Sequence, residues 1–412
     1  MIKQLQLNRN HIKIERALIS VFDKTGVVEL AKTLEEMNVE ILSTGGTYKV
    51  LQEASIKVVD VSEYTKFPEI MNGRVKTINP LIGGGLLGLR DEHENDAKEN
   101  NIQWIDLVIC NLYPFAEATS KENCDEALAL ENIDIGGPTM IRAAAKNLGW
   151  VCVAVDPNDY TNIADELKTT GKISFESRKS FSAKAFGHTA KYDTIIHNYF
   201  KSEKLSEDFS LTFTKHSDLR YGENPHQSGA AYKVSDGKDY NILNAHIRQG
   251  KKLSYNNIMD ADGALACVKE FDKPACVIVK HANPCGVAIG KNILEIYSRA
   301  FKADSLSAFG GIVAFNRKCT KEVAQEITSV FVEIVLAPSF EVEALEIFKK
   351  KKNLRILEIG DFSKRTSKLE VRNIDGGILV QEVDTKTLYE NDLQIVTAKK
   401  PTKKNIEDAL FT

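Results

Sequence analysis

Short apolar runs alternate with stretches of helical periodicity over the first part of the chain, and this alternation constrains the fold most. The runs have the length and branched composition of buried strands: residues 17–21, 39–42, 58–61, 105–110 and 151–155. Between them, apolar residues recur at helical spacing, as Val27, Leu30 and Leu34 do. Strands joined by helices predict a mostly parallel sheet that is covered on both faces.

The rest of the chain predicts a second domain. Its clearest strand is the apolar run from Ala275 to Val279, and Asn283, Pro284 and Gly286 predict a turn after it. Polar residues with sparse periodicity predict a linker before this domain. We therefore expect a leader at 1–15, a first domain at 16–200 with its core at about 16–160 and a helical extension, a linker at 201–218, and a second domain at 219–412.

Composition excludes several classes of protein. The chain has 412 residues and a formal net charge of -3, so no basic field points to nucleic acid or an anionic membrane. No apolar run approaches the length of a membrane span, and the polar start of the chain has no secretion signal. The 7 Cys lack paired metal spacing and indicate reduced thiols, which predicts a cytoplasmic protein.

A glycine-rich stretch, Ser43 to Thr47, follows the second predicted strand and precedes a helix. In this layout, backbone N–H groups and a helix N-terminus can bind a phosphate. Many turns have a similar sequence, so the motif alone is weak. A second glycine-led loop carries the cations Arg74 and Lys76, and the alternative interpretation is a solvated basic turn.

The apolar run at 275–279 ends in Lys280 and His281. A buried strand that delivers a cation and an imidazole to its carboxyl end places them where α/β sheets usually bind ligands. His281 can exchange a proton near neutral pH, and Lys280 can stabilise a developing anion. The alternative is a surface strand end with two incidental basic residues. A zinc-deaminase site is rejected, because Asn283 replaces its Glu and no second Cys follows Cys285 at the required spacing.

Several short motifs occur in one order across both domains. They are Ser20 to Gly26, Ser43 to Thr47, Gly73 to Thr77, Asn111 to Phe115, Asp134 to Gly137, Ala143 to Asn147, Arg220 to Gln227 and Lys280 to Gly286. Each motif is modest alone. Together, and in this order, they resemble a bifunctional purine-biosynthesis family. That family combines the transformylase of 5-aminoimidazole-4-carboxamide ribonucleotide (AICAR) with inosine monophosphate (IMP) cyclohydrolase.

The resemblance implies an α/β fold in two parts. A methylglyoxal-synthase-like parallel-sheet domain would act as the cyclohydrolase, and a cytidine-deaminase-like α/β domain would act as the transformylase. It implies formyl transfer from 10-formyltetrahydrofolate to AICAR, ring closure of formyl-AICAR to IMP, no metal, and a homodimer. The family's transformylase region continues beyond the equivalent of Thr412, so we expect an incomplete second domain and a chain competent mainly for ring closure.

The resemblance also implies residue roles. The catalytic groups would be Lys76, Tyr113, Asp134, Lys146, Lys280 and His281. The first domain would bind the nucleotide through Ser20, Asp23, Lys24, Thr44, Gly45, Gly46, Thr47, Arg74, Val75, Thr77, Cys110, Asn111, Ile135 and Gly136. The second domain would bind it through Arg220, Tyr221, Phe309, Gly310 and Glu333.

The expected chemistry assigns these groups to two reactions. Ring closure builds an oxyanion, which Lys76, Lys146 or the backbone N–H groups of Gly136 and Gly137 would stabilise. Asp134 near Lys146 would shuttle a proton. In formyl transfer, His281 would act as the base for a weakly nucleophilic amine, and Lys280 would stabilise the tetrahedral intermediate. The alternative is a non-catalytic nucleotide-sensing module, which need not keep all of the catalytic groups of the first domain.

The sequence departs from the family pattern at three positions near the first site. Asn79 and Gly83 replace two histidines, and Phe22 stands where a small hydroxyl residue or Tyr is common. Phe22 removes one possible side-chain donor to phosphate, although its backbone N–H would be expected to remain available.

Overall fold

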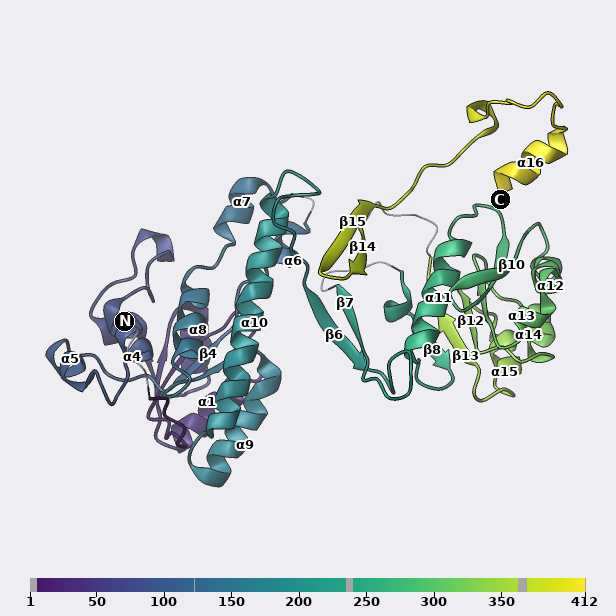
Figure 1. Cartoon of the computed structure of the whole chain (residues 1–412). Helices are drawn as coiled ribbons and strands as arrows, with labels where there is room; N and C mark the ends of the chain where they lie inside the picture. Colours follow the sequence, from purple (N-terminus) through teal and green to yellow (C-terminus); the bar gives the residue numbers. More distant parts are fainter. Residues whose placement is uncertain (1–5, 122, 235–239, 362–368, 412) are drawn as a thin grey trace. The chain divides into compact units, whose positions relative to one another are not determined.

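The computed structural model describes residues 6–121, 123–234, 240–361 and 369–411 (Figure 1). It divides into two compact units, residues 1–212 and 213–412. The described part of unit 1 contains a 5-stranded sheet. Its strands are β1 (Arg16–Ser20), β2 (Glu40–Ser43), β3 (Val58–Asp60), β4 (Leu107–Cys110) and β5 (Cys152–Ala154).

The sheet of unit 1 has the strand order β3-β2-β1-β4-β5, and every neighbouring pair is parallel. The prediction of a parallel α/β sheet is therefore confirmed, and each predicted apolar run overlaps a strand. Successive residues of a strand point to opposite faces. Accordingly, Ala17 and Ile19 lie in one hydrophobic cluster and Leu18 lies in the other.

Helices cover both faces of this sheet. α1 (Val27–Glu36) and α9 (Tyr160–Thr170) pack on the first face, whereas α4 (Pro80–Leu87), α8 (Gly136–Lys146) and α10 (Phe175–Phe200) pack on the second. The shorter helical elements are α2 (Gly45–Glu53), α3 (Val61–Thr65), η1 (Met71–Gly73), α5 (Glu94–Glu99), α6 (Phe115–Thr119), α7 (Glu126–Glu131) and η2 (Pro157–Asp159). Burial on both faces explains why the strands read as continuous apolar runs.

The stretch expected as a loose leader packs onto unit 1 over residues 10–14. Ile12 and Ile14 are buried, and Ile12 exchanges backbone hydrogen bonds of 3.0 and 2.9 Å with Ile173. The fully buried guanidinium of Arg178 donates to the carbonyl of Asn10 at 3.0 Å. Ile12 and Ile14 alternate with polar residues, as in a half-buried strand, but two apolar residues are too few to predict a strand in a polar stretch.

Unit 2 contains a mixed sheet, with the order β10-β9-β11-β12-β13-β8 in its described residues. The strands are β8 (His246–Gln249), β9 (Ala275–Lys280), β10 (Asn283–Ile289), β11 (Ile312–Phe315), β12 (Ile334–Ala337) and β13 (Arg355–Glu358). β11, β12 and β13 are parallel, whereas β9 is antiparallel to both of its neighbours. α11 (Tyr255–Val268) covers one face. The other face carries α12 (Ile293–Ala303), α14 (Lys321–Thr328) and α15 (Val342–Phe348).

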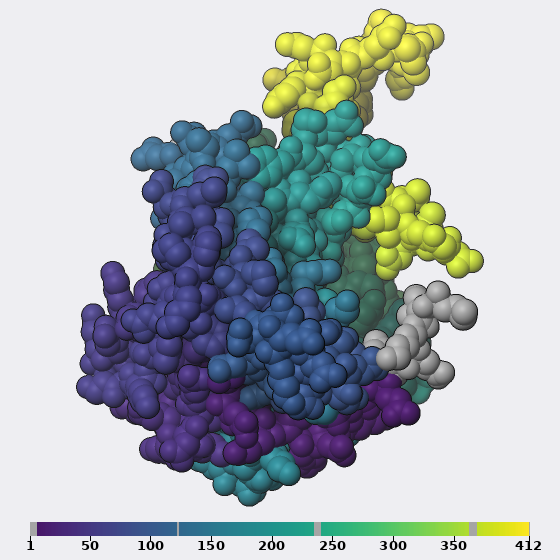
Figure 2. Space-filling model, turned by 90° about the vertical axis from the view of Figure 1, so that its left-hand side faces the viewer, coloured from purple at the N-terminus to yellow at the C-terminus, as the bar shows by residue number. Residues whose placement is uncertain are grey.

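Two separate hairpins and a thin C-terminal segment complete unit 2. The hairpins are β6 (Phe213–Asp218) with β7 (Ala230–Val234) and β14 (Leu369–Ile374) with β15 (Gly377–Glu382). β6 lies inside the stretch that was expected to be a linker. The sequence did not predict this strand, because its side chains are mostly exposed and show no apolar periodicity. Residues 385–411 are mostly exposed and are drawn in yellow in Figure 2. The remaining elements are η3 (Ile242–Asn244), α13 (Ser305–Ala308), η4 (Glu390–Asp392) and α16 (Lys403–Phe411).

The turn after β9 lies two residues earlier than the sequence predicted. Asn283 pairs with Lys280, so Asn283, Pro284 and Gly286 belong to β10 and the reversal falls at His281 and Ala282. These two residues have φ values of 55° and 59°, as the tightest hairpin loops require at both positions. Pro284 was interpreted as a turn residue, but it lies in β10. This strand is at the edge of the sheet, where the missing N–H of a proline is tolerated.

In the described part of the chain, no helix has both the length and the apolar character needed to cross a membrane.

Candidate active sites

The amino end of α2 lies between two lysine ammonium groups. β2 ends at Ser43, and Gly45 begins α2 with φ 56°. A Cβ on Gly45 would lie 3.6 Å from Nζ of Lys76, and one on Gly46 would lie 3.8 Å from Nζ of Lys24. The free N–H groups of a helix start and two cations favour an anion such as a phosphate.

Two of the residues predicted to bind nucleotide, Asn111 and Thr47, support the loop that follows β1. Asn111 accepts the N–H groups of Phe22 and Asp23 at 2.7 and 2.9 Å, and it donates to the carbonyl of Asp23 at 3.0 Å. The Phe22 N–H is therefore already engaged. The Thr47 hydroxyl accepts from and donates to the backbone of Val21 at 3.0 and 2.9 Å. Their side chains thus hold the rim of the site in place.

Cys110 does not reach the site through its thiol. The side chain is 1% exposed within a core cluster, and burial raises the pKa of the thiol. A buried neutral thiol contributes packing and no nucleophile.

A cavity of about 800 Å³ gathers eight of the residues predicted for the first site. Its lining includes Ser20, Arg74, Lys76, Thr77, Tyr113, Asp134, Ile135 and Gly136. These residues come from the end of β1, the loop after η1, the loop after β4 and the start of α8. Residues far apart in the sequence therefore converge near the carboxyl edge of the sheet, where parallel α/β sheets usually bind ligands. We call this space the main cavity.

Asp134 is held at the start of α8. Its Oδ1 accepts the N–H of Gly137 at 2.8 Å, and its own N–H donates to the phenol oxygen of Tyr192 at 2.8 Å. Burial raises the pKa of the Asp134 carboxyl, although the N–H of Gly137 and the nearby charge of Lys76 act in the opposite direction. The group is thus biased toward holding a proton, which suits an acid–base role.

Glycine is required at the start of α8. A Cβ on Gly136 would lie 2.8 Å from the Thr77 hydroxyl, and one on Gly137 would lie 2.5 Å from Oδ2 of Asp134. Both distances are too short for a real Cβ atom. Glycine therefore lets the backbone approach the side chains of Thr77 and Asp134 more closely than a residue with a Cβ could. Gly136 and Gly137 both line the main cavity, where the N–H of Gly137 is engaged by Asp134.

The mouth of the main cavity carries a salt bridge that the sequence did not indicate. Arg74 pairs with Glu131, the last residue of α7, and both side chains are exposed. Tyr113 is 46% exposed and packs edge-on against Phe22, with ring centroids 5.5 Å apart. Motif reading could not find Glu131, because its relation to Arg74 exists only in the folded chain.

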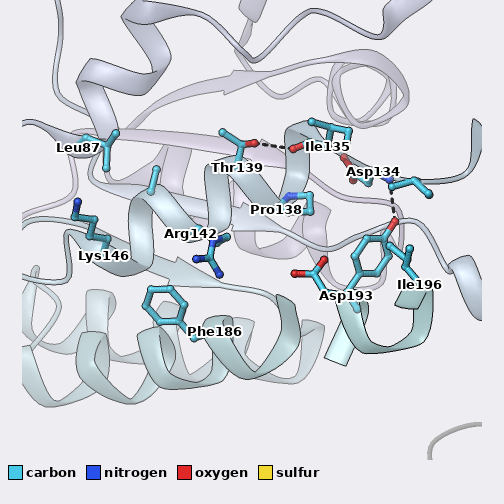
Figure 3. A pocket seen from close by; sticks show the side chains of 13 residues that line it. Leu87, Asp134, Ile135, Pro138, Thr139, Arg142, Lys146, Phe186, Asp193 and Ile196 are labelled. Atoms are coloured by element: carbon cyan, nitrogen blue, oxygen red, sulfur yellow. Dashed lines mark hydrogen bonds between the residues drawn. The ribbon is translucent and has the colours of Figure 1, made fainter. Parts of the chain in front are cut away.

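Lys146 lines a neighbouring pocket rather than the main cavity. This second pocket, of about 620 Å³, also contains Arg142, Phe186 and Asp193 (Figure 3). Asp134 and Ile135 contribute to both pockets. Lys146 is the last residue of the 11-residue α8, whose ends are roughly 15 Å apart at 1.5 Å per residue. The expected proximity of Asp134 and Lys146 therefore does not occur within one chain.

The departures from the family pattern have local explanations. Asn79 caps α4 by accepting the N–H of Leu81 at 2.9 Å. A Cβ on Gly83 would meet nothing within 4 Å, so this glycine is not required by packing. Neither residue lines the main cavity.

In unit 2, the predicted residues meet at one end of the mixed sheet. Because β9 runs antiparallel to β11, its carboxyl end lies at the amino ends of β11 and β12. The Lys280 ammonium donates to the carbonyl of Phe309 at 2.7 Å. Gly310 follows with φ 72°, and Glu333 immediately precedes β12. The site thus lies at the opposite edge of the parallel strands from the one that the general rule for α/β sheets favours.

The first half of α11 connects these segments. Asp260 accepts the N–H of Ala282 at 2.8 Å, and Asn257 donates to Oε2 of Glu333 at 2.8 Å. Asn256 donates to the carbonyl of Glu223 at 3.4 Å, in the loop that carries the predicted Arg220 and Tyr221. The Arg220 guanidinium lies 5.7 Å from the Tyr221 ring centroid.

Most of the functional side chains predicted in unit 2 are accessible to solvent. His281 and Arg220 are exposed, and Phe309 is 58% exposed. Among the described residues, no cluster of three or more His, Cys, Asp or Glu side chains is arranged to hold a metal.

Comparison with known proteins identifies the family. The model of the "AICARFT/IMPCHase bienzyme" family matches residues 144–412, more than half of the chain, and that of the "MGS-like domain" matches residues 26–139. This chain belongs to the AICARFT/IMPCHase bienzyme family. The family assignment confirms the predicted resemblance and the order of its two α/β parts.

Curated relatives of this family are similar over almost all of the chain. The bifunctional purine biosynthesis protein PurH of Acetivibrio thermocellus is 50% identical over 407 residues, which are 97% of this chain and 79% of that protein. The PurH protein of Thermoanaerobacter sp. is 50% identical over 402 residues, 96% of this chain and 78% of that protein. The prediction of a bifunctional purine-biosynthesis enzyme is confirmed, but the match does not separate the two steps.

Among solved structures, "Crystal structure of ForH" matches 46% of this chain and 100% of that chain, with 31% identity and a TM-score of 0.42. This structural similarity is too weak to add to the family assignment.

Proposed function

We propose that unit 1 closes the ring of formyl-AICAR to form IMP in the main cavity. The observation that carries this proposal is the convergence of Lys76, Tyr113, Asp134 and the start of α8 on one cavity of about 800 Å³. Nucleotide-sized ligands occupy cavities of this order. A non-catalytic sensor would need the phosphate-binding groups but not a buried carboxyl with a raised pKa.

The nucleotide would be anchored through its 5′-phosphate at the start of α2. Lys24 and Lys76 flank the N–H groups of Gly45 and Gly46, so a dianion there would be paired on two sides. The heterocycle would then extend into the main cavity toward Tyr113 and Asp134. This placement orients the two reacting groups, which contributes to the rate by proximity alone.

Ring closure joins the carboxamide nitrogen to the formyl carbon. The carbonyl oxygen becomes an oxyanion, which Lys76 would stabilise. The N–H of Gly137, which the sequence suggested for this role, is instead bonded to Asp134. The carboxamide nitrogen and the formamide nitrogen each lose one proton, and the formyl oxygen leaves with both as water. Asp134 would carry a proton between nitrogen and oxygen, for which a raised pKa is suited.

Lys146 is a further candidate for a catalytic group. Its side chain lines the second pocket rather than the main cavity, so within one chain it is not placed to contact the closing ring. Lys146→Ala tests this role. Loss of turnover with unchanged nucleotide affinity would support it, and unchanged turnover would remove it.

For unit 2, we propose formyl transfer from 10-formyltetrahydrofolate to the amine of AICAR. His281 would take the amine proton, Lys280 would stabilise the tetrahedral oxyanion, and Glu333 would accept hydrogen bonds from the nucleotide. The support is that α11 and the Phe309 carbonyl hold the segments carrying these residues at one edge of the sheet. The reaction needs no metal in this scheme, since the folate nitrogen is the leaving group.

We also propose that the chain forms a homodimer. A groove of about 550 Å³ in unit 2 is lined by exposed apolar side chains that include Phe213, Tyr232 and Met259. An uncovered apolar surface of this kind favours association. Analytical ultracentrifugation is expected to give twice the chain mass, and a monomer at micromolar concentration would contradict the proposal.

The decisive experiment for unit 1 follows conversion of formyl-AICAR to IMP by ultraviolet absorbance, without folate. We expect turnover by the wild-type chain and a loss of about 10²-fold in Lys76→Ala, because an oxyanion-stabilising group is removed. His281→Ala serves as the matched control, since unit 2 is not expected to contribute to ring closure. Nucleotide binding without any turnover would favour the sensing module and overturn the proposal.

A further inference from the structure

α10 contacts the whole length of the segment that carries Asp134. The Arg178 guanidinium donates to the carbonyls of Leu148 and Gly149 at 2.8 and 3.2 Å, just beyond the end of α8. The Ser182 hydroxyl donates to the carbonyl of Ala145 at 2.8 Å. The Tyr192 hydroxyl accepts the N–H of Asp134 at 2.8 Å, just before α8 begins. The long helix is therefore hydrogen-bonded to both ends of the shorter one.

Tyr192 is the contact at the end of α8 that faces the main cavity. Its ring is 7% exposed within a core cluster, and its hydroxyl lies 3.4 Å from the carbonyl of Asn132. One oxygen thus accepts from Asp134 and donates toward Asn132. The hydrogen bond to the Asp134 N–H is one of the dashed lines in Figure 3.

The carboxyl group of Asp134 has little freedom while this contact exists. Its side chain is fixed by the N–H of Gly137 at 2.8 Å, and its backbone is fixed by Tyr192. A Cβ on Gly137 would lie 2.5 Å from Oδ2, so the carboxyl is packed closely against the helix start. Loss of the phenol oxygen would leave a partly buried N–H without its acceptor, and the loop would shift to find another.

We propose that Tyr192 is a positioning residue for ring closure, which holds the Asp134 carboxyl in its reactive orientation through the backbone. The inference rests on the ring closure proposed for the main cavity. Tyr192 itself does not touch the substrate, because its hydroxyl reaches the site only through the Asp134 N–H. Misplacement of a reacting group by about 1 Å can lower the rate by about 10²-fold.

Tyr192→Phe removes only the phenol oxygen. We expect kcat for ring closure to fall about 10-fold or more, and KM for formyl-AICAR to change less than about twofold, because the phosphate site is untouched. The limb of the pH–rate profile that Asp134 controls is expected to move to lower pH. A loosened loop admits water, which weakens the burial that raises the pKa of this carboxyl.

Ser182→Ala is the matched control. Ser182 is also buried, on the same helix, and it donates one hydrogen bond to α8 at the end that faces away from the main cavity. We expect Ser182→Ala to lower thermal stability without changing kcat or the pH profile. Equal kinetic effects of the two substitutions would mean that α10 acts only by general stabilisation, which would overturn the proposal.

Amide hydrogen exchange provides a test that needs no variant. In the wild-type chain, the Asp134 N–H is expected to exchange far more slowly than the exposed amides of the loops around it, because Tyr192 holds it. Rapid exchange would contradict the proposal even if Tyr192→Phe failed to fold. A wild-type chain without ring closure would instead overturn the proposed function, whereas an active wild type with a fully active Tyr192→Phe would overturn this inference alone.

Discussion

The two units place their predicted functional groups in opposite settings. In unit 1, the groups surround a cavity whose carboxylate, Asp134, is fixed at two points and partly buried. In unit 2, His281 lies on an exposed hairpin tip, and Phe309 is 58% exposed. An electrostatic site is most effective where water is excluded and the groups are already oriented. We infer that unit 1 is organised for catalysis within the single chain, whereas unit 2 is not.

The type of sheet accounts for much of this difference. All strands of unit 1 are parallel, so their carboxyl ends and the helix starts that follow them meet at one edge. In unit 2, β9 is antiparallel, so Lys280 and His281 reach the amino ends of β11 and β12. The site there depends on α11 and on loop segments for its shape.

The largest expected effect is in unit 1, where Asp134→Asn should lower ring closure by at least about 10²-fold. Asn can still accept the N–H of Gly137, so the fold should be retained. Asp193→Asn, in the second pocket, is the control and should leave turnover unchanged. Steady-state kinetics on the wild type, Asp134→Asn and Asp193→Asn would show whether ring closure in unit 1 depends on the buried carboxyl of Asp134.

Stability should change in a pH-dependent way in the same variant. Burial raises the pKa of Asp134, so the folded state binds this proton more tightly than the unfolded state does. The stability that the protonated carboxyl contributes is fully present below the pKa that Asp134 has in the unfolded chain. It is lost as the pH rises through the higher pKa that Asp134 has in the folded chain. Denaturant unfolding should therefore show the largest stability advantage of Asp134→Asn near pH 7 and a shrinking one in acid.

The phosphate anchor should give the next largest effect. The nucleoside that lacks the 5′-phosphate is expected to bind unit 1 about 10²-fold more weakly than the nucleotide, because charged hydrogen bonds to Lys24, Lys76 and the start of α2 are lost. Calorimetry with IMP and inosine measures this difference. Equal affinities would remove the anchor at the start of α2 from the account.

The smallest effect concerns the hairpin of unit 2. Ala282 has φ 59°, a conformation that costs an L-residue more than it costs glycine. Ala282→Gly is expected to raise the free energy of unfolding of unit 2 by about 0.5–1 kcal/mol. Ala288→Gly, at a buried position of β10, should instead lower it. A destabilised Ala282→Gly variant would mean that the hairpin tip is not strained.

The sequence predicted local structure well wherever burial leaves a pattern. The parallel strands of unit 1 and the helix after Ser43 follow from apolar runs and a glycine-rich turn. Relations across the fold were not readable: the salt bridge of Arg74 with Glu131 and the hydrogen bond of Asp134 with Tyr192 join segments with no local signal. The separation of Lys146 from Asp134 was missed because motif order gives no distance, whereas the rise of α8 does.

The most direct test of the difference between the units measures both half-reactions on one preparation of the chain. Ring closure of formyl-AICAR and formyl transfer from 10-formyltetrahydrofolate to AICAR are followed under the same conditions and protein concentration. We predict that ring closure exceeds formyl transfer by about 10²-fold or more, because unit 1 presents its groups in a cavity, whereas His281 of unit 2 is exposed. Formyl transfer at a comparable rate would contradict the account, since it would show that the exposed Lys280 and His281 are already sufficiently organised in this chain.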